Sequence, residues 1–386
     1  MSEVLDMQTA ARKWPEAFTD RSLYTSAEIL EEEFRRIFAH VWLFVAHESQ
    51  VPNPGDFVRK TVARQPLLVV RDESSTVHVF FNTCRHRASL VEVEKSGNRN
   101  RFACPYHGFT YSCSGDLVRV PNEDGYGVWF DKAKFGLIEV PRTEVRNGMI
   151  FVSFGATVPS LKEYFGEADE LFDYATSADS EPLRVVDSYD YEIGANWKLL
   201  IDNTMDGYHV PYVHAGPIAK SGSSSSMGGT VRDLDIHGVI EWNQKKPAAQ
   251  RTLNRYIAIF PNLTVNYNAG GDMYGIRQIE PLAADRMRVS MYFLRPVSSN
   301  AKATERSARS FAVTWGPGGL FGGDDAKQLE WVQEGMKAAC ASPVIAARAL
   351  DSGKVGDYEG EQSIRGIRRG WIRYMDKTLT GLEGRA

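Results

Sequence analysis

The sequence predicts an α+β protein in which a small all-β domain precedes a larger α+β domain. Two observations carry this prediction. Between Pro52 and Phe154, short β-prone runs are broken by Pro, Gly and Asn, which is typical of an all-β domain. Beyond about residue 156, β-prone stretches alternate with stretches whose apolar residues recur at helical spacing. A chain of 386 residues is also too long for one small domain.

The first predicted element is a helix from Thr25 to Trp42. Thr25 and Glu28 fit a capping box, in which the two side chains satisfy free backbone N–H groups. The apolar residues at helical spacing are Leu30, Phe34, Ile37, Phe38 and Val41. We expect residues 1–44 to form an N-terminal helical segment that packs as a lid on the C-terminal domain.

Residues 45–155 are the predicted all-β domain. Its candidate strands are Asp56–Ala63, Leu67–Arg71, Val77–Asn82 and Met149–Phe154. An amphipathic helix that opens at Pro159 and Ser160 and continues through Leu171 then marks a domain boundary near residue 156.

Residues 156–386 are the predicted α+β domain. Its extended candidates are Arg184–Ile193, Tyr256–Phe260, Leu263–Tyr267 and Arg288–Arg295. Its helical candidates are residues 196–206, 325–340 and 363–376. The Gly/Ser-rich segment Ser221–Gly229 is predicted to be a surface loop.

The composition excludes several classes of protein. A formal charge of −4 gives no reason to expect nucleic acid or an anionic membrane as a partner. The longest apolar run, Val41 to Ala46, is too short to cross a bilayer, and the first twelve residues contain no secretory h-region. We therefore expect a cytoplasmic protein, in which Cys113 and Cys340 are ordinary thiols rather than a disulfide.

The most specific pattern is Cys84-x-His86, seventeen intervening residues, and Cys104-x-x-His107. A Rieske [2Fe–2S] cluster needs two thiolates on one iron and two imidazoles on the other, and this pattern supplies that set. Gly97 and Gly108 suit tight turns around the cluster. The alternative is a zinc site, although zinc motifs usually group Cys with Cys and His with His.

A second pattern, His209-x4-His214, follows the predicted helix 196–206, and Gly207 and Pro211 interrupt any regular helix there. Two His and one carboxylate form the usual mononuclear ferrous site that activates dioxygen. In isolation, two histidines five residues apart are more often solvated or core residues. The other histidines show no such pairing and are given that ordinary interpretation: His40, His47, His78 and His237.

The segments Cys84-Arg-His-Arg and Cys104-Pro-Tyr-His-Gly-Phe-Thr-Tyr resemble the Rieske signature of ring-hydroxylating oxygenase large subunits, although Phe109 stands where that family more often has Trp. The resemblance extends over residues 20–376. It implies a helix-grip-like antiparallel catalytic domain after the Rieske domain. It also implies a head-to-tail trimer in which the cluster of one subunit faces the iron of its neighbour.

The same resemblance supplies the missing site residues. The segment Gly316–Asp325 is similar to the one that carries the third iron ligand in the family, and of its two acids we choose Asp325, with Asp324 as the helix cap. Asp206 matches the family acid that bridges His107 of one subunit to His209 of the next, the alternative being a solvated or capping residue.

The resemblance further implies O₂ and an aromatic or related organic substrate. Electrons are expected from a reductase, often through a ferredoxin, which fits the absence of a nucleotide-binding motif. A small β subunit could complete an α3β3 assembly in place of α3. Arene dihydroxylation is weighed against monohydroxylation and N- or O-demethylation, and more remotely against a Rieske electron carrier or a binding protein. The ligands do not distinguish the oxygenase outcomes.

Substrate-pocket residues are hard to predict from sequence. Five residues in strand-like stretches could line a cavity, although such residues usually belong to the core: Phe260, Val265, Tyr267, Met273 and Tyr292. Arg277 is a candidate for binding a substrate carboxylate. Its sequence position favours the alternative, an ion pair at the surface or between domains.

Overall fold

The structure is a computed structural model of the chain. It describes residues 7–178, 181–216, 229–243, 251–269, 272–339, 342–350 and 358–375. The chain forms two compact units: a β unit, Phe38–Leu161, and a mixed unit made of residues 1–37 and 162–386. These limits lie a few residues from the predicted ones, and residues 1–44, 45–155 and 156–386 remain our proposal for the domains. Cys340 and the predicted loop Ser221–Gly229, apart from Gly229, lie outside the described residues.

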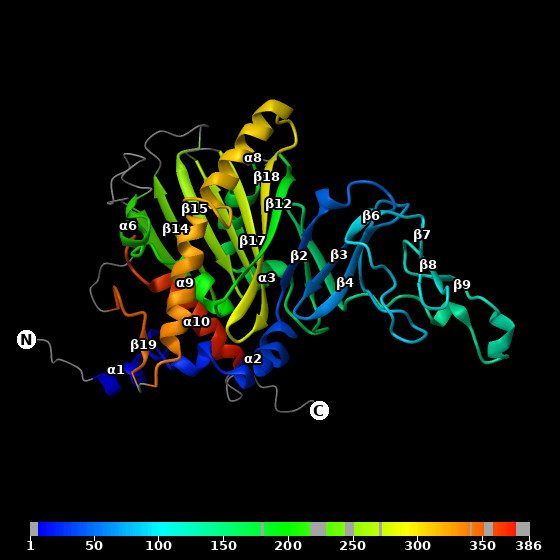
Figure 1. The fold of residues 1–386 in the computed structure, drawn as a ribbon, viewed down its shortest axis with the longest axis horizontal. Coiled ribbons are helices and arrows are strands. Elements are labelled where there is room, and N and C mark those ends of the chain that lie inside the picture. The colour runs from blue at the N-terminus through cyan, green and yellow to red at the C-terminus, as the bar shows by residue number, and fades with distance from the viewer. Residues whose placement is uncertain are drawn as a thin grey trace, which may run out of the picture. The chain divides into compact units, whose positions relative to one another are not determined.

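The β unit consists of three small antiparallel sheets (Figure 1). The sheets have the orders β5-β4-β3-β6, β10-β11-β2 and β7-β8-β9. The strands are β2 Leu43–His47, β3 Asp56–Val62, β4 Gln65–Arg71, β5 Val77–Phe81, β6 Ser96–Asn98, β7 Arg101–Ala103, β8 Thr110–Ser112, β9 Leu117–Arg119, β10 Arg142–Arg146 and β11 Met149–Ser153. All four strands predicted in this region are present, each within two residues of its predicted ends.

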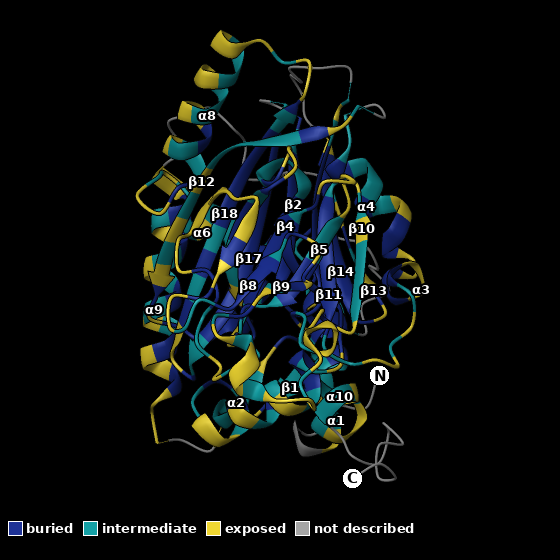
Figure 2. Cartoon of the chain, turned by 90° about the vertical axis from the view of Figure 1, so that its right-hand side faces the viewer, coloured by how far each residue is buried: buried dark blue, intermediate teal, exposed yellow. Residues whose placement is uncertain are grey.

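The mixed unit is built on one seven-stranded antiparallel sheet of order β12-β18-β17-β16-β15-β14-β13. Its strands are β12 Leu183–Ile193, β13 Gly229–Leu234, β14 His237–Asn243, β15 Leu253–Ile259, β16 Leu263–Asn268, β17 Met273–Ala283 and β18 Arg286–Pro296. Strands β13 to β18 follow one another as neighbours, whereas β12, which comes earlier in the chain, pairs with β18 at the far edge. Buried residues run along the central strands β14 to β17 (Figure 2). The expectation of an α+β fold with a large antiparallel sheet is confirmed.

Helices cover both faces of the large sheet. The described α-helices of the chain are α1 Met7–Lys13, α2 Ala27–Glu33, α3 Leu161–Phe165, α4 Ala168–Thr176, α5 Trp197–Thr204, α6 Val210–Val213, α8 Ala301–Trp315, α9 Gly322–Met336 and α10 Gln362–Met375. Helix α4 packs on β15 and β16, where Tyr174 of the helix contacts the ring of Tyr267. On the opposite face, Phe311 of α8 fills the space above Gly275, and Ser363 of α10 approaches Gly238. Helix α8 and strands β10, β13, β14 and β17 were not predicted from the sequence.

The N-terminal helix is shorter than the predicted Thr25–Trp42. Helix α2 ends at Glu33 and continues as a π-helical turn, Phe34–Phe38, before β2 begins. The cap is Ser26 rather than Thr25, because the Ser26 side chain accepts the hydrogen bond from the N–H of Ile29. The predicted capping box is therefore wrong, because the residue three positions after the cap is Ile29, whose side chain cannot accept a hydrogen bond.

Hydrogen bonds to Glu33 connect the N-terminal segment to the rest of the mixed unit. Glu33 is fully buried, and its carboxylate accepts hydrogen bonds from Nζ of Lys198 (2.6 Å) and from the indoles of Trp197 (2.7 Å) and Trp371 (2.6 Å). A buried carboxylate is tolerated only with partners of this kind. These contacts support our proposal that the N-terminal segment packs on the C-terminal domain.

The predicted helix through Leu171 is split into α3 and α4. Gly166 lies between them with φ of +52°, a left-handed conformation that ends α3. None of the described helices combines the length and the apolar character needed to cross a membrane.

Candidate metal centres

The first candidate centre lies in two loops of the β unit. The loop that follows β5 carries Cys84 and His86, and its shape is set by two backbone hydrogen bonds. The N–H of Cys84 donates to the carbonyl of Ser89 (2.8 Å), and the N–H of Ala88 donates back to the carbonyl of Cys84 (2.9 Å). These bonds close a compact turn that holds the Cys and the His together.

The loop between β7 and β8 repeats this pattern. The N–H of Cys104 donates to the carbonyl of Phe109 (2.8 Å), and the N–H of Gly108 donates to the carbonyl of Cys104 (3.0 Å). The equivalent residue of each turn is left-handed, with φ of 56° at Ala88 and 72° at Gly108. Gly108 adopts this conformation without steric cost, as predicted. The prediction for Gly97 is wrong, because Gly97 lies within β6.

The side chains of these loops gather in one place. The thiols of Cys84 and Cys104 are each 3% exposed, form no disulfide and lie within interaction distance of each other. The rings of His86 and His107 have centroids 4.5 Å apart. Nδ1 of His86 is buried and has no hydrogen-bond partner among the described residues. Two thiols beside two imidazoles, one with a free ring nitrogen, fit the donor set of a Rieske cluster.

Burial and the positive charges of His107 and Arg87 lower the pKa of His86. The neutral imidazole, which is the form that binds a metal, is thereby favoured. Phe109, found where Trp is more common, stacks on His86 with centroids 4.8 Å apart and planes inclined by 9°. This contact fixes the orientation of the His86 ring.

Tyr111 also contacts this centre, although no role was predicted for it from the sequence. Its hydroxyl accepts a hydrogen bond from the N–H of Arg85 (3.1 Å) and lies 3.3 Å from Sγ of Cys84. Because the hydroxyl oxygen already accepts the backbone N–H, its proton is free to point at the sulfur. Hydrogen bonds to cluster sulfurs are one means by which proteins set the reduction potential.

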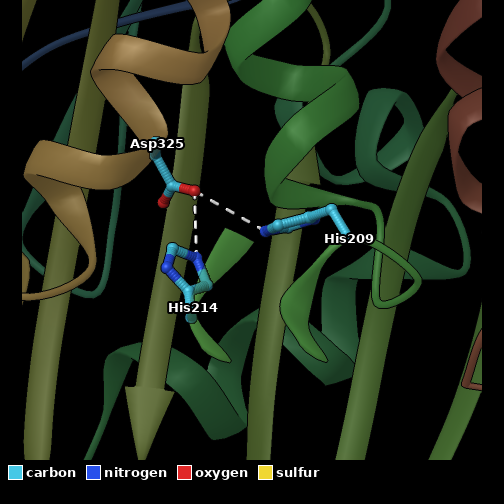
Figure 3. Close-up of side chains that lie close together, drawn as sticks. All are labelled: His209, His214 and Asp325. Atoms are coloured by element: carbon cyan, nitrogen blue, oxygen red, sulfur yellow. Dashed lines mark ion pairs between the residues drawn. The ribbon is translucent and has the colours of Figure 1, made fainter. Parts of the chain in front are cut away.

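The second candidate centre is a triad in the mixed unit: His209, His214 and Asp325. One ligand atom of each lies within 4.8 Å of the others. Oδ1 of Asp325 is 3.1 Å from Nε2 of His214 and 3.6 Å from Nε2 of His209. Figure 3 shows both imidazoles pointing toward this carboxylate. Two imidazoles and one carboxylate are the donor set of a mononuclear ferrous site.

The local sequence explains where the two histidines stand. Helix α5 ends at Thr204, before Gly207, and the short helix α6 begins after His209 with Pro211 in its first turn, where proline is tolerated. A Cβ on Gly207 would lie 2.3 Å from the carbonyl oxygen of Tyr358, so only glycine fits. The chain therefore turns twice within ten residues and brings His209 and His214 to one side.

Helix α9 supplies the carboxylate and is anchored to α5. The side chain of Gln333 accepts from the N–H of Asn196, the residue that caps α5, at 2.8 Å and donates to the carbonyl of Tyr24 at 2.9 Å. Helix α9 starts at Gly322, so Asp324 lies in its first turn and is not the cap that was predicted. Oδ2 of Asp324 is 3.6 Å from Nδ1 of His214, and its side chain is about half exposed.

The charges of the triad support one another. Burial opposes ionisation of Asp325, but the hydrogen bond from His214 and the positive charges of His209, His214 and Arg277 lower the pKa of Asp325. Burial likewise opposes protonation of His209, but the carboxylates of Asp206 and Asp325 raise the pKa of His209. The site thus favours an ionised carboxylate, which a divalent cation requires as a ligand.

Asp206 lies beside the triad. Its Oδ2 is 3.4 Å from Nδ1 of His209, and its Oδ1 accepts a hydrogen bond of 2.6 Å from the N–H of Tyr208. Nδ1 of His209 makes no hydrogen bond of good geometry to any described residue. Asp206 is thus placed next to the ring nitrogen that would not bind a metal.

Comparison with known families decides the assignment of these two centres. The profile of the ring hydroxylating alpha subunit (catalytic domain) matches residues 180–377, about half of the chain, and that of the Rieske [2Fe-2S] domain matches residues 41–139. The chain belongs to the ring-hydroxylating alpha-subunit family.

This alpha subunit is the catalytic subunit of a Rieske non-heme iron oxygenase. Its cofactors are a Rieske [2Fe–2S] cluster and a mononuclear iron at the triad of His209, His214 and Asp325. The zinc alternative is therefore wrong. A simple electron carrier is excluded as well, because the catalytic domain is present.

Relatives of the alpha subunit have several activities. It is 27% identical to the 2-halobenzoate 1,2-dioxygenase large subunit of Burkholderia cepacia over 83% of this chain and 77% of that protein. It is 34% identical to the N,N-dimethyl phenylurea N-demethylase subunit alpha of a Sphingobium strain over 56% of this chain and 50% of that protein. Its fold matches naphthalene 1,2-dioxygenase from Rhodococcus sp. with a TM-score of 0.85 and 26% identity, covering 93% of this chain and 94% of that one.

The structure also brings forward a residue that the sequence did not suggest. Nδ2 of Asn203 is 3.4 Å from Nε2 of His209 and 3.3 Å from Oδ1 of Asp325. Asn203 lies in the last turn of α5, three residues before Asp206. A polar residue six positions before the first histidine was the available signal.

One expectation about the substrate region, the ion pair of Arg277, is corrected. Arg277 is 5% exposed and pairs with no carboxylate among the described residues, so the surface or interdomain ion pair is wrong. Cross-strand partners share a face, and Val265, Tyr267 and Tyr292 belong to the face opposite to Arg277. Of the five pocket candidates, Met273 shares the face of Arg277.

A cavity of about 250 Å³ lies elsewhere in the mixed unit, where the N-terminal segment meets α5 and α10. Its lining includes Tyr24, Lys198, Asp202 and Arg368 but none of the triad residues. We do not assign it to the reaction.

Proposed function

We propose that this alpha subunit is the terminal oxygenase of a multicomponent system that hydroxylates an aromatic substrate, most simply to a cis-dihydrodiol. In that reaction an arene, O₂, NADH and a proton give the dihydrodiol and NAD⁺, with both oxygen atoms entering the product and two electrons supplied by NADH. The observation that carries the proposal is the buried triad of two imidazoles and one carboxylate in the same chain as the cluster loops. The 2-halobenzoate and naphthalene dioxygenases among its relatives support the aromatic class.

We assign the cluster ligands as Cys84, His86, Cys104 and His107, and the mononuclear iron ligands as His209, His214 and Asp325. A ferrous ion bound at the triad supplies dioxygen activation. Three protein ligands leave coordination positions open for oxygen close to the substrate. Asn203 approaches both His209 and Asp325 and is suited to hold their relative orientation.

Asp206 is assigned a role in transferring electrons between subunits. A metal-bound histidine normally donates its second ring N–H to a carboxylate, and Asp206 lies 3.4 Å from that nitrogen of His209. In the proposed head-to-tail trimer, the other oxygen of Asp206 meets His107 of the neighbouring subunit. Its negative charge then keeps both imidazoles in the tautomer that exposes the metal-binding nitrogen.

The proposed electron donors are a reductase and, where needed, a ferredoxin. The sequence has no dinucleotide-binding motif, so NADH alone is expected to give no product. Relatives are named as large or alpha subunits, which supports a small β subunit as a further partner. An α3 or α3β3 assembly follows from this proposal.

Product analysis tests the function. The purified protein, supplied with a heterologous reductase and ferredoxin, NADH and O₂, is offered aromatic acids, aromatic hydrocarbons and N-methyl compounds. A cis-dihydrodiol from an arene supports the proposal. Formaldehyde from an N-methyl compound, with no arene product, would replace it with the demethylase alternative, which the relationship to the phenylurea N-demethylase favours.

A further inference from the structure

Arg277 is a buried cation without a counter-ion in the described part of the structure. It stands in the middle of β17, and its side chain is 5% exposed. Its one hydrogen bond to a described residue runs from Nη1 to Oγ1 of Thr204 at 3.4 Å, while Nε has no partner there. A buried guanidinium normally pairs with a carboxylate, because removing the charge from water is costly. This arrangement leaves most of its donors unused.

The residues beside Arg277 on the sheet also have unused polar atoms. Thr264 of β16 is directly opposite Arg277, and Asn266 is opposite Gly275, two residues along. Cross-strand partners point to the same face of a sheet, so these side chains and Arg277 share one face. Oγ1 of Thr264 and Oδ1 of Asn266 are buried and have no hydrogen-bond partner among the described residues. A native core leaves few such groups unsatisfied, and the free hydroxyl of Thr264 points to a ligand that accepts its hydrogen bond, whereas the amide oxygen of Asn266 is an acceptor and needs a different partner.

The same face borders the iron triad. Thr204, which receives the hydrogen bond from Arg277, is the last residue of α5 and precedes His209 by five residues. The guanidinium carbon of Arg277 is 5.9 Å from the ring of Trp315. Trp315 stacks on Phe321 at 5.1 Å, and Phe321 meets the ring of His214 at 4.8 Å. Strands of the sheet pass behind the triad in Figure 3.

A purely electrostatic role for Arg277 fits less well. Its charge does favour ionised Asp325, but a divalent ion at the triad would repel a second buried cation. Nor would that role use Nε or satisfy Thr264. An anion bound to Arg277 and Thr264 removes both difficulties, because a carboxylate accepts the guanidinium in a bidentate manner and the hydroxyl as well.

We propose that Arg277 and Thr264 bind the carboxylate of the substrate, so that the chain acts on a benzoate-type aromatic acid rather than on a neutral arene. The inference rests on the proposed aromatic oxygenase function and names its substrate class. In this role, neither residue contacts the iron or dioxygen. Both are specificity-determining residues that hold the acid end of the substrate while its ring lies toward the triad.

Binding of benzoate is compared with binding of nitrobenzene, which has nearly the same shape and no net charge. Calorimetric titration of the anaerobic holoenzyme measures both without turnover. We expect wild type to prefer benzoate, and Arg277→Met to lose about 100-fold in benzoate affinity, equal to about 2.8 kcal/mol at 1.4 kcal/mol per tenfold. Its affinity for nitrobenzene should change by less than about threefold, because no charged bond is lost.

Further variants keep the test valid if Arg277→Met folds poorly, which its iron content would show. Arg277→Lys retains the charge but not the bidentate geometry and should lose about 10-fold, as should Thr264→Val, which removes only the hydroxyl. Arg288→Met makes the same substitution at an exposed arginine of β18 and should match wild type.

The inference is overturned if the wild type binds nitrobenzene as tightly as benzoate, or binds neither compound. It is also overturned if Arg277→Lys and Thr264→Val each bind benzoate as tightly as the wild type does. Failure of the proposed function is a different result. The chain would then yield no oxygenated product from any arene in the presence of its reductase, whatever the outcome of the titrations.

Discussion

The two metal sites of this chain are organised over very different lengths of sequence. The four residues assigned to the cluster fall between positions 84 and 107, on two loops with the same pair of backbone hydrogen bonds. The iron triad joins His209 and His214 to Asp325, across 110 intervening residues. The cluster loops are shaped mainly by local backbone geometry. The triad instead depends on how helix α9 packs against α5 and the sheet.

Because the two sites are built from different parts of the chain, each should be able to lose its metal independently of the other. A site made from local turns on a small β unit should keep its metal when the other site is destroyed, and the reverse should also hold. A site assembled by long-range packing should be more sensitive to the stability of the whole unit. The predictions below test whether the two sites behave as separate structures.

The largest effect is expected from removing a metal ligand. Purified protein should contain about three irons per chain and inorganic sulfide, two irons in the cluster and one mononuclear. His209→Ala should lose one iron and keep the visible absorption of the cluster, while product formation falls by at least about 1,000-fold because dioxygen activation is lost. His107→Ala should lose the visible absorption. Equal loss of both signals in either variant would show that the sites are not independent.

Asp206→Asn should separate electron transfer from metal binding. The amide keeps the size of the side chain but removes the charge, so both iron contents and the cluster absorption should persist. Turnover should fall by about 100-fold, the upper range for residues that support a metal ligand. Asp324→Asn is the matched control, because Asp324 lies 3.6 Å from Nδ1 of His214 but is about half exposed. If Asp206→Asn turns over like wild type, Asp206 is simply a solvated acid.

Acid should destabilise both units, because burial lowers the pKa of one histidine in each of them. Burial lowers the pKa of His47, in the β unit, and of His237, in the mixed unit, to about 4. In His237, Nδ1 accepts from the N–H of Phe260 and Nε2 donates to the carbonyl of Tyr164, so a second proton would break the first bond.

The unfolded chain binds these protons near pH 6.5 and the folded chain only near pH 4, so stability is present at neutral pH and falls as the pH drops through that window. Between pH 7 and pH 5 each histidine should cost about 2 kcal/mol of unfolding free energy, measured by denaturant titration. His47→Gln and His237→Gln should each flatten the pH dependence. If neither variant alters the pH dependence of the unfolding free energy, that dependence arises from other titrating groups.

The smallest effect compares the two cluster loops. Ala88 holds the left-handed conformation that Gly108 holds in the other loop, and alanine is strained there. Ala88→Gly should therefore stabilise the protein by about 0.5–1 kcal/mol in thermal or denaturant unfolding, part of the relief being offset by greater freedom of the unfolded chain. Gly108→Ala should act in the opposite direction, since its Cβ would also lie 3.1 Å from Pro121. Equal effects of one sign would mean that the loops are not equivalent.

Local chemistry allowed the cluster site to be predicted from sequence. The spacing of Cys84, His86, Cys104 and His107 reflects short turns, and short turns depend on residues close in the chain. The same holds for the four strands of the β unit that were predicted, β3, β4, β5 and β11, whose ends lie within two residues of prediction. Two local details were predicted wrongly. Ser26, not Thr25, caps α2, and Gly97 pairs in β6 instead of forming a turn.

Elements without a visible hydrophobic pattern were missed. Helix α8 has one buried residue, Phe311, and its sequence holds few large apolar residues of the kind that marked the predicted helices. Strand β17 is buried on both faces over most of its length, which removes the alternation that marks a half-buried strand. In both cases the burial that stabilises the element comes from residues far away in the chain.

By itself, the sequence determined the type of the cluster site, because its ligand identities and short-range spacing are local properties, whereas the iron site was predicted only with the help of the family resemblance. Only the tertiary structure decided which atoms surround the substrate region. It brought Asp325 from α9 to the two histidines, turned Val265, Tyr267 and Tyr292 away from the face that borders the triad, and left Arg277 buried on that face without a carboxylate among the described residues. The physical reason is that the face on which a strand residue lies depends on strand register, and its partners depend on long-range packing, neither of which is written in neighbouring residues.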